Sequence, residues 1–350
     1  MTPYSFRQTI QRTLLIILVF AYPNFSKAQE KTLFQVMWWN VENLFDCKHD
    51  SLKNDYDFLP QSIRHWTYHR FTKKLNQIAQ TIVAIGKWNT PAIIGLCEVE
   101  NDIVLTHLTQ YSSLKNLHYR YVMTHSEDKR GINIALLYQR DQFKLLQTQF
   151  IRIPPHKLRP TRDILHVSGL ILSLDTLDIF LCHLPSRAGG GKETEKYRLE
   201  VANQLKQVVD SVLQRREHPN VIIMGDFNDD IKNKTLTEVM QIKNPTSASI
   251  HNTDLYHLYY EKAKQRNYGS YKYKGIWQLL DHILVSGLLI DPTNALHTHP
   301  NSAHVARFPF LLEKDKKYGG VQPLRTYKGM KYQEGISDHL PLYVDFELNW

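Results

Sequence analysis

Cysteine is scarce in this sequence. Only Cys47, Cys97 and Cys182 are present, and an odd number excludes a fully paired set of disulfides. Cys97 (IIGLCEVE) and Cys182 (IFLCHLP) lie in strand-like runs, each directly before a polar residue. Because side chains alternate along a strand, we expect both thiols to point away from the polar side and into packing. The sequence therefore predicts buried free cysteines rather than a catalytic thiol.

Hydrophobic runs long enough to span a membrane are also missing. An apolar run, LLIILVFAY at residues 14–22, is too short to cross a bilayer comfortably. It follows two arginines and precedes the small residues Ser26 and Ala28, which is the layout of a secretory signal cleaved after Ala28. An uncleaved membrane helix is the alternative. We expect residues 1–28 to be a signal peptide, no stable membrane anchor, and an exported protein, periplasmic or secreted.

The sequence has no internal repeat and no low-complexity linker, so one domain over residues 29–350 is the simplest organisation. Hydrophobic residues make up 42% and charged residues 22%, which favours a globular chain over a disordered one. Removal of residues 1–28 takes away three basic residues and no acidic one, so the formal charge falls from +9 to +6. A basic balance suits a polyanionic partner, although an ordinary solvated surface explains it as well.

Apolar runs of strand length recur along the chain, bounded by Gly, Pro, Asn or Asp. The predicted strands span residues 33–39, 92–97, 132–138, 164–173, 177–183, 220–225, 280–286 and 340–347. Helical periodicity predicts helices over 69–88 and 193–215 and a weaker one over 234–242. Strands and helices do not alternate strictly, which favours an α/β fold with mixed sheets. Residues 301–336, rich in lysine and glycine, predict a long surface insertion.

Polar residues stand at the ends of these apolar strands. The set comprises Asn40, Glu98, His183, Asp226, Asn228, Asp281, Asp338 and His339. Each one alone has an ordinary explanation as a turn former, a helix cap or a packed side chain. Their shared position relative to the strands predicts that they converge in one cleft.

The residue types in this set suit phosphate ester hydrolysis. Carboxylate and amide oxygens are hard ligands for Mg²⁺, which keeps several waters and bridges to phosphate. The set lacks the thiolates and close histidine pairs of a zinc site. A histidine with an aspartate partner acts as a general acid or base near neutral pH. The expected cofactor is Mg²⁺ (or Mn²⁺).

Six segments carry a specific resemblance: MWWNVEN, GLCEVEN, LCHLPSR, MGDFND, LLDHILVS and SDHLPL. They resemble, in the same order, the signature segments of the endonuclease/exonuclease/phosphatase family, and they span residues 37–342. That family includes pancreatic-type deoxyribonuclease, abasic-site endonucleases, neutral sphingomyelinases and inositol-polyphosphate phosphatases. The resemblance implies an α/β four-layer sandwich, with two mixed β-sheets packed face to face, helices outside and the active site at one edge.

The resemblance also implies which residues bind the metal and the substrate. Asn40 and Glu98 resemble the main metal-binding pair of the family, and Asp338 resembles a further carboxylate near the metal. Arg162 stands where some members place an arginine that contacts phosphate, and an ordinary surface arginine is the equal alternative.

The remaining residues resemble the family's catalytic groups. Asp226 and His339 resemble the groups that orient or deprotonate the attacking water, and Asp281 resembles the partner of that histidine. Asn228 resembles a phosphate-binding asparagine. His183 resembles the histidine that binds phosphate or protonates the leaving group in the nuclease branch.

Two departures from the nuclease branch are visible. Glu100 stands where deoxyribonuclease-like members tend to carry a base, and their paired cysteines are missing. In the other direction, YGSYKYKGIW at residues 268–277 interleaves aromatic residues with lysines, a pattern that suits stacking of bases and contact with phosphates. An alternating, packed hairpin is the alternative for this stretch.

We expect an exported divalent-metal-dependent phosphoesterase, foremost a nuclease that acts as a monomer on nucleic acid. The alternative on the same fold is a phosphatase or a sphingomyelinase-like phospholipid phosphodiesterase. A non-catalytic binding protein is the least favoured hypothesis, because a competent residue fills each expected catalytic position.

Overall fold

The computed structural model describes residues 31–155, 160–188, 190–246 and 249–350. The predicted signal peptide, residues 1–28, lies outside these residues. Among the described residues, no helix is both long and apolar enough to span a membrane.

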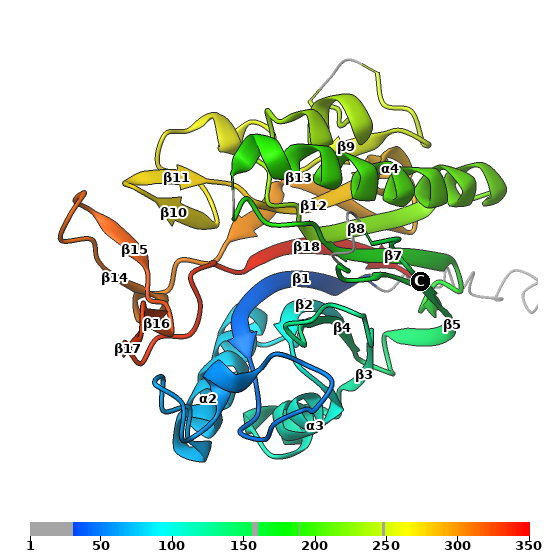
Figure 1. The fold of residues 1–350 in the computed structure, drawn as a ribbon. Coiled ribbons are helices and arrows are strands. Elements are labelled where there is room, and N and C mark those ends of the chain that lie inside the picture. The colour runs from blue at the N-terminus through cyan, green and yellow to red at the C-terminus, as the bar shows by residue number, and fades with distance from the viewer. Residues whose placement is uncertain (1–30, 156–159, 189, 247–248) are drawn as a thin grey trace, which may run out of the picture.

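Two six-stranded sheets pack face to face (Figure 1). The first contains, in order across the sheet, β13 (Leu296–Val305), β18 (Leu342–Asn349), β1 (Lys31–Leu44), β2 (Ile93–Val99), β4 (Asn133–Tyr138) and β3 (Arg120–Met123). The second contains β5 (Phe143–Ile151), β6 (Ile164–Ile171), β7 (Thr176–His183), β8 (Asn220–Asp226), β12 (Asp281–Ser286) and β9 (Leu255–His257). The eight predicted strands are all present, and β3, β5, β9 and β13 are additional.

The strands are apolar on both faces because both faces are covered. On β1, Val36 and Trp38 pack between the two sheets, whereas Met37 and Trp39 pack on the other side, beneath a helix. Strands buried in this way are continuous apolar runs rather than alternating patterns. This explains why VMWW contains no polar residue.

Helices cover the outer faces and complete four layers. The helices α2 (Tyr68–Gly86) and α3 (Asp102–Gln110) lie on the first sheet, and α4 (Gly191–Arg215) lies on the second (Figure 1). The side chain of Asn101 caps α3 by accepting a hydrogen bond from the backbone N–H of Val104. The weak helix expected at 234–242 is a short π-helix, Thr235–Val239. The predicted four-layer α/β sandwich is therefore confirmed.

Each sheet has one parallel pair of strands at its centre. β1 is parallel to β2, with Asn40 opposite Cys97, and β7 is parallel to β8, with His183 opposite Asp226. All other pairings within the two sheets are antiparallel. Because parallel strands end at the same edge, each sheet delivers two polar strand ends side by side.

Two small projections stand beside that edge (Figure 1). One is the hairpin of β10 (Tyr271–Tyr273) and β11 (Ile276–Gln278), so the hairpin given above as the alternative for residues 268–277 is present. The other, which we call the arm, covers residues 312–332 and contains β14 (Leu312–Lys314), β15 (Val321–Pro323), β16 (Tyr327–Lys328) and β17 (Lys331–Tyr332). The expected insertion at 301–336 is thus shorter, because β13 extends to Val305.

A buried ion pair joins the hairpin to the arm. Lys272 Nζ lies 2.8 Å from Asp315 Oδ2, and both side chains are only 4% exposed. Lys272 Nζ also donates to the carbonyl of Gly319. The two projections are therefore held together as one wall.

The cysteines behave as predicted. All three are free, and Cys97 and Cys182 are fully buried in the packing between layers. Burial raises the pKa of both thiols well above its usual value, so they remain protonated.

Candidate active site

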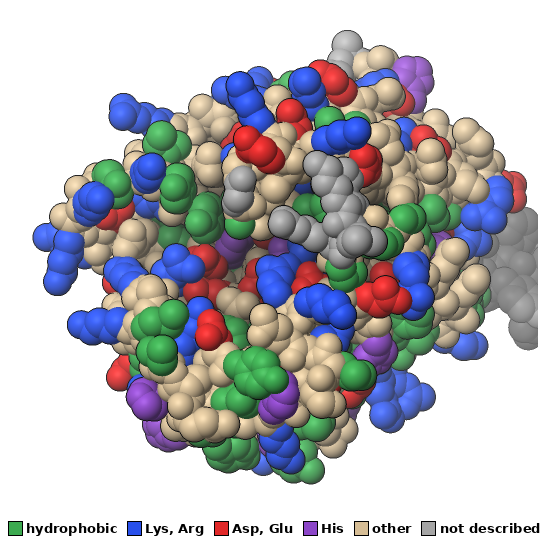
Figure 2. Space-filling view, viewed as in Figure 1, with side chains coloured by type: hydrophobic (Ala, Val, Ile, Leu, Met, Phe, Trp, Pro, Cys, Tyr) green, Lys and Arg blue, Asp and Glu red, His purple; other side chains and the backbone are tan. Residues whose placement is uncertain are grey.

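A pocket of about 680 Å³ opens where the central strands of both sheets end. Figure 2 shows a hollow on this face, with acidic and histidine side chains inside it and lysines and arginines at its rim. Seven of the eight predicted strand-end residues line the pocket, namely Asn40, Glu98, His183, Asp226, Asn228, Asp338 and His339.

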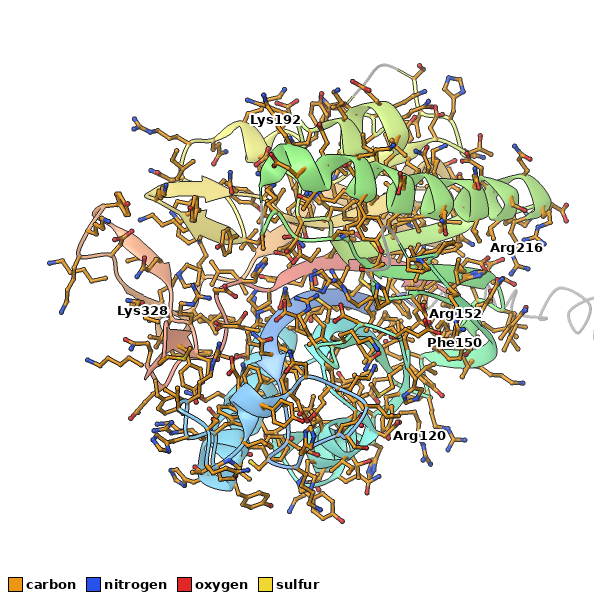
Figure 3. The ribbon with its side chains drawn as sticks, in the orientation of Figure 1. Arg120, Phe150, Arg152, Lys192, Arg216 and Lys328 are labelled. Atoms are coloured by element: carbon orange, nitrogen blue, oxygen red, sulfur yellow. The ribbon has the colours of Figure 1, made fainter. Side chains whose placement is uncertain are left out.

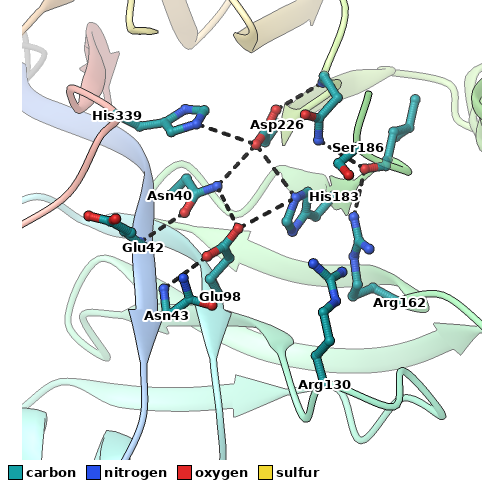
Figure 4. A network of polar contacts seen from close by, with 12 residues as sticks. Asn40, Glu42, Asn43, Glu98, Arg130, Arg162, His183, Ser186, Asp226 and His339 are labelled. Atoms are coloured by element: carbon teal, nitrogen blue, oxygen red, sulfur yellow. Dashed lines mark hydrogen bonds and ion pairs between the residues drawn. The ribbon is translucent and has the colours of Figure 1, made fainter. Parts of the chain in front are cut away.

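Asn40 links the two sheets at the floor of the pocket (Figure 4). Its Nδ2 donates to Asp226 Oδ2 on the second sheet at 3.0 Å and to Glu98 Oε1 on its own sheet at 3.3 Å. Glu98 Oε2 accepts a hydrogen bond from the backbone N–H of Asn43 at 2.9 Å. Asn40 therefore fixes the relative position of the two carboxylates.

His183 stands opposite Asn40. Its Nε2 lies 3.5 Å from Asp226 Oδ2 and 4.0 Å from Glu98 Oε1, and its buried Nδ1 has no hydrogen-bond partner among the described residues. Burial and the nearby positive charges of Arg162 and Arg130 hold the pKa of His183 well below its usual value. His183 is therefore neutral at pH 7 and offers an N–H to an incoming oxyanion.

Asp281 lies behind His339, outside the pocket lining. His339 Nδ1 and Asp281 Oδ2 are 2.6 Å apart, and the same carboxylate accepts from Trp38 Nε1 at 2.9 Å and Ser270 Oγ at 2.5 Å. Burial disfavours the charged imidazole, but Asp281 and Asp226 outweigh it and raise the pKa of His339 well above its usual value. The predicted histidine–aspartate pair is present, and its charged form is favoured.

Asp226 connects these groups. Its Oδ1 accepts from the backbone N–H of Asn228 at 2.9 Å, and its Oδ2 lies 3.9 Å from Nε2 of His339. Burial and the charge of Asp281 raise the pKa of Asp226 to about 7, although His339 acts in the opposite direction. A carboxylate that exchanges its proton near neutral pH is suited to general-base work.

The local backbone is arranged to present these side chains. Glu42, Asn43, Glu98 and Asn228 all have left-handed φ values, of 48°, 52°, 63° and 52°. The pairing of β1 with β2 and of β2 with β4 is also irregular here, at the ends of both strands. Such conformations cost about 1–3 kcal/mol each and persist where the surroundings enforce them, most often at functional sites.

Asp338 meets an arginine from the arm. Arg325 Nη2 lies 2.8 Å from Asp338 Oδ2 and 3.1 Å from Glu42 Oε1. Burial and the charge of Asp338 raise the pKa of Glu42 to about 7, although Lys74 and Arg325 partly counter this. The pocket thus holds several carboxylates close together, and a bound cation would reduce the repulsion between them.

The donor set fits a hard divalent cation. Glu98 and Asp338 present carboxylates to the pocket, and no cysteine lines it. The amide oxygen of Asn40 accepts from the backbone N–H of Glu42, so this oxygen is engaged in the present structure. Asp226, Asp281 and His339 place ligand atoms within 4.8 Å of one another, but Asp281 already has three hydrogen-bond partners and does not line the pocket. Two other carboxylates that face the pocket and could hold a cation are those of Glu98 and Asp338.

The structure does not place Arg162 in the pocket. Its side chain is 3% exposed, and it contacts Asp128 at 3.3 Å and the carbonyl of Leu184 at 2.6 Å. The arginines that do line the pocket are Arg130, Arg187 and Arg325. Sequence reasoning missed them, because none stands directly at a strand end; Arg187 lies four residues beyond β7, within the LCHLPSR segment.

Glu100 also lies away from the pocket. It is 6% exposed, and its Oε2 accepts from the backbone N–H of Asp46 at 2.7 Å. The departure that Glu100 makes from the nuclease branch therefore lies outside the pocket.

A second cavity, of about 770 Å³, lies between β5, β6 and the C-terminal part of α4. Its floor is a saturated polar cluster: Asp178 accepts from His166, Ser168 and Arg216. Figure 3 labels Arg216 near the end of α4 that is remote from Lys192. None of the predicted catalytic residues lines this cavity.

The comparison with known families agrees with the geometry. The model of the endonuclease/exonuclease/phosphatase family matches residues 35–348, and the chain belongs to that family. Its members are typically phosphoesterase hydrolases that depend on a divalent metal. No curated protein matches the chain by sequence.

Solved structures share the fold at low sequence identity. An endonuclease/exonuclease/phosphatase family protein from Bacteroides thetaiotaomicron is 17% identical, covers 91% of this chain and 99% of its own, and has a TM-score of 0.57. A mannosyl-6-phosphatase from the same species is 16% identical (89% and 99%, TM-score 0.55). TDP2 of D. rerio, complexed with a single-strand DNA product, is 15% identical (90% and 99%, TM-score 0.54).

Proposed function

We propose that the protein is an exported, divalent-metal-dependent phosphodiesterase that hydrolyses the backbone of nucleic acids. The observation that carries this proposal is the convergence, on one pocket, of the Asn40–Glu98 pair from one sheet and Asp226 from the other, with the Asp281–His339 pair behind it. When bound beside Glu98 and Asp338, Mg²⁺ or Mn²⁺ would neutralise phosphate charge and stabilise the leaving oxygen.

Side chains of the pocket carry out the proton transfer and bind the phosphate oxygens. Asp226 takes a proton from the attacking water, and the imidazolium of His339 stabilises the charge next to it. The Nε2–H of neutral His183 and an amide hydrogen of Asn228 donate to the phosphate oxygens. Asp281 holds His339 in orientation through Nδ1.

The wall beside the pocket favours a nucleic acid as substrate. Tyr271 and Tyr273 of the hairpin line the pocket, and Tyr273 is 54% exposed. Lys274 is exposed next to Tyr273, and exposed lysines also occur on the arm, whereas Lys272 is engaged with Asp315. The bases of a single-stranded nucleic acid stack on exposed aromatic rings, and neighbouring cations contact its phosphates.

A second candidate is a phosphatase or phospholipid phosphodiesterase. The pocket is bounded on one side by the arm and carries three arginines, which suits a compact, strongly anionic head group. One structural neighbour is titled a mannosyl-6-phosphatase.

A substrate panel separates these candidates. Plasmid, single-stranded DNA, RNA, sugar phosphates and phosphocholine lipids would be incubated with Mg²⁺, Mn²⁺ or chelator. The proposal expects metal-dependent cleavage of nucleic acid. Release of phosphate or phosphocholine with nucleic acid left intact would select the second candidate, and inertness towards the whole panel would contradict both.

We also propose export and a monomeric state. N-terminal sequencing of the mature protein is expected to begin at Gln29, and light scattering to give the mass of one chain. A retained N-terminus in the cell would contradict export.

A further inference from the structure

A small recess continues from the main pocket beneath the arm. It has a volume of about 130 Å³ and shares Tyr271, Arg325 and Asp338 with the main pocket. Its other walls include Gln322 and Lys328 of the arm. A group bound in the recess would therefore be joined to the group undergoing reaction in the main pocket.

The recess is lined by donors that retain hydrogen-bonding capacity. The hydroxyl of Tyr271 and Nη1 of Arg325 have no hydrogen-bond partner among the described residues. Lys328 Nζ has one acceptor, Glu313 at 2.7 Å, and its side chain is 44% exposed, so two of its three hydrogens stay available. Gln322 Nε2 uses one hydrogen on the same carboxylate at 2.9 Å.

Acidic residues outside the recess hold these donors in place. Glu313 accepts from both Gln322 and Lys328, and the Lys272–Asp315 pair fixes the arm against the hairpin. Asp338 at the junction is already paired with Arg325. The arrangement is preorganised, because the cations are oriented before any ligand arrives.

We propose that this recess binds a second phosphate group of the substrate, next to the one that is hydrolysed. Its donors match an oxyanion, and its volume is that of several water molecules at about 30 Å³ each rather than of a base and a sugar together. The inference rests on the proposed phosphoesterase function. The second phosphate is either the neighbouring phosphodiester of a polynucleotide or a further phosphate of a small molecule.

Kinetics with paired substrates test this subsite. One pair is a thymidine dinucleotide against a trinucleotide, with a further trinucleotide carrying a neutral methylphosphonate at the neighbouring position. The other is a nucleoside monophosphate against the corresponding bisphosphate. For the pair that the enzyme accepts, KM should be about tenfold lower with the second charged phosphate. In Lys328→Met and in Gln322→Leu, the ratio of KM without the second charged phosphate to KM with it should fall towards one.

Lys331→Met is the matched control, since Lys331 is exposed on the same β16–β17 hairpin and does not line the recess. It should keep the advantage for the second phosphate. An advantage that is absent in the wild type, or that Lys328→Met retains in full, would overturn the subsite. An enzyme that hydrolyses none of these substrates with either metal would instead contradict the proposed function.

Binding without turnover gives an independent measurement. The affinity for a single-stranded oligothymidylate would be measured in chelator over a range of salt concentrations. Loss of one phosphate contact should reduce the slope of log K against log salt by about 0.7 in Lys328→Met, with no change in Lys331→Met. Equal slopes in all three proteins, or no binding of the oligonucleotide, would overturn the polynucleotide form of the subsite.

Discussion

The imidazole of His339 and the carboxylate of Asp281 lie 2.6 Å apart, and both groups are buried. Trp38 and Ser270 hold the carboxylate from two further directions. The free Nε2 of His339 is thereby aimed at Asp226, 3.9 Å away. The buried contacts of Asp281 therefore fix the orientation of the His339 imidazole.

Asp281→Asn should lower kcat by at least about a hundredfold, because an amide neither fixes the tautomer of His339 nor stabilises its charge. Ser270→Ala removes one donor to the same carboxylate and should cost only a few-fold. The measurement is kcat on the best substrate of the panel, with circular dichroism to confirm folding. Near wild-type turnover in Asp281→Asn would show that this pair is not catalytic.

Glu98 and Glu100 provide a matched pair of variants. Glu98→Gln should weaken Mg²⁺ binding and reduce turnover by more than about a hundredfold, because Glu98 faces the pocket. Glu100→Gln should retain turnover within about threefold, because its side chain accepts from Asp46 away from the site. Calorimetric titration with Mg²⁺ and initial rates check both. Equal losses in the two variants would refute the assignment of the cation to Glu98.

Acid stability should depend on Asp178. Burial opposes its charged form, but hydrogen bonds from His166, Arg216 and Ser168 lower its pKa to about 2. The unfolded chain therefore binds the proton more tightly, so this stabilisation is complete above about pH 4 and is lost as pH falls towards 2. Asp178→Asn should lower the unfolding free energy at pH 7 by about 2 kcal/mol. It should also make the unfolding free energy depend less steeply on pH below about pH 4.

Urea denaturation from pH 2.5 to pH 7 measures the effect of Asp178→Asn. Turnover at pH 7 serves as the control, since the cluster does not line the active-site pocket. A variant whose unfolding free energy varies with pH as steeply as that of the wild type would contradict the assignment.

The arm should loosen when its buried ion pair is broken. Asp315→Asn leaves the ammonium group of Lys272 without its counter-charge and so weakens the contact between the arm and the hairpin. Because the arm is a local projection, we expect faster tryptic cleavage at its lysines while the two sheets stay intact. Peptide mapping during limited proteolysis measures this. Wild-type cleavage rates in Asp315→Asn would show that other contacts hold the arm.

The fold could be predicted where burial makes a strand uniformly apolar. VMWW before Asn40 and VIIMG before Asp226 are such strands, and the polar residue after each marks the edge where the site forms. The edge strand β5 was missed because solvent covers much of it, so FKLLQTQFI shows neither a continuous apolar run nor an alternation. The nine-residue helix α3 was missed because DIVLTHLTQ is short and has β-branched residues at its second and third positions.

The site could be predicted only as far as its residues follow strands. Arg325 reaches Glu42 across 283 residues of sequence, from an arm whose shape depends on tertiary contacts. Nothing in its neighbours along the chain marks it as part of the pocket. The burial of Arg162 could not be predicted for a related reason, because the sequence near a strand does not show whether a guanidinium faces the pocket or the core.

The hydrogen bonds of Asn40 make the site depend on the packing of the two sheets. The Asn40 amide joins Glu98 on one sheet to Asp226 on the other, and Trp38 reaches Asp281 across the same interface. Neither sheet holds a complete site by itself. The site is therefore complete only when the two sheets are packed against each other, so turnover can serve as a measure of correct packing between them.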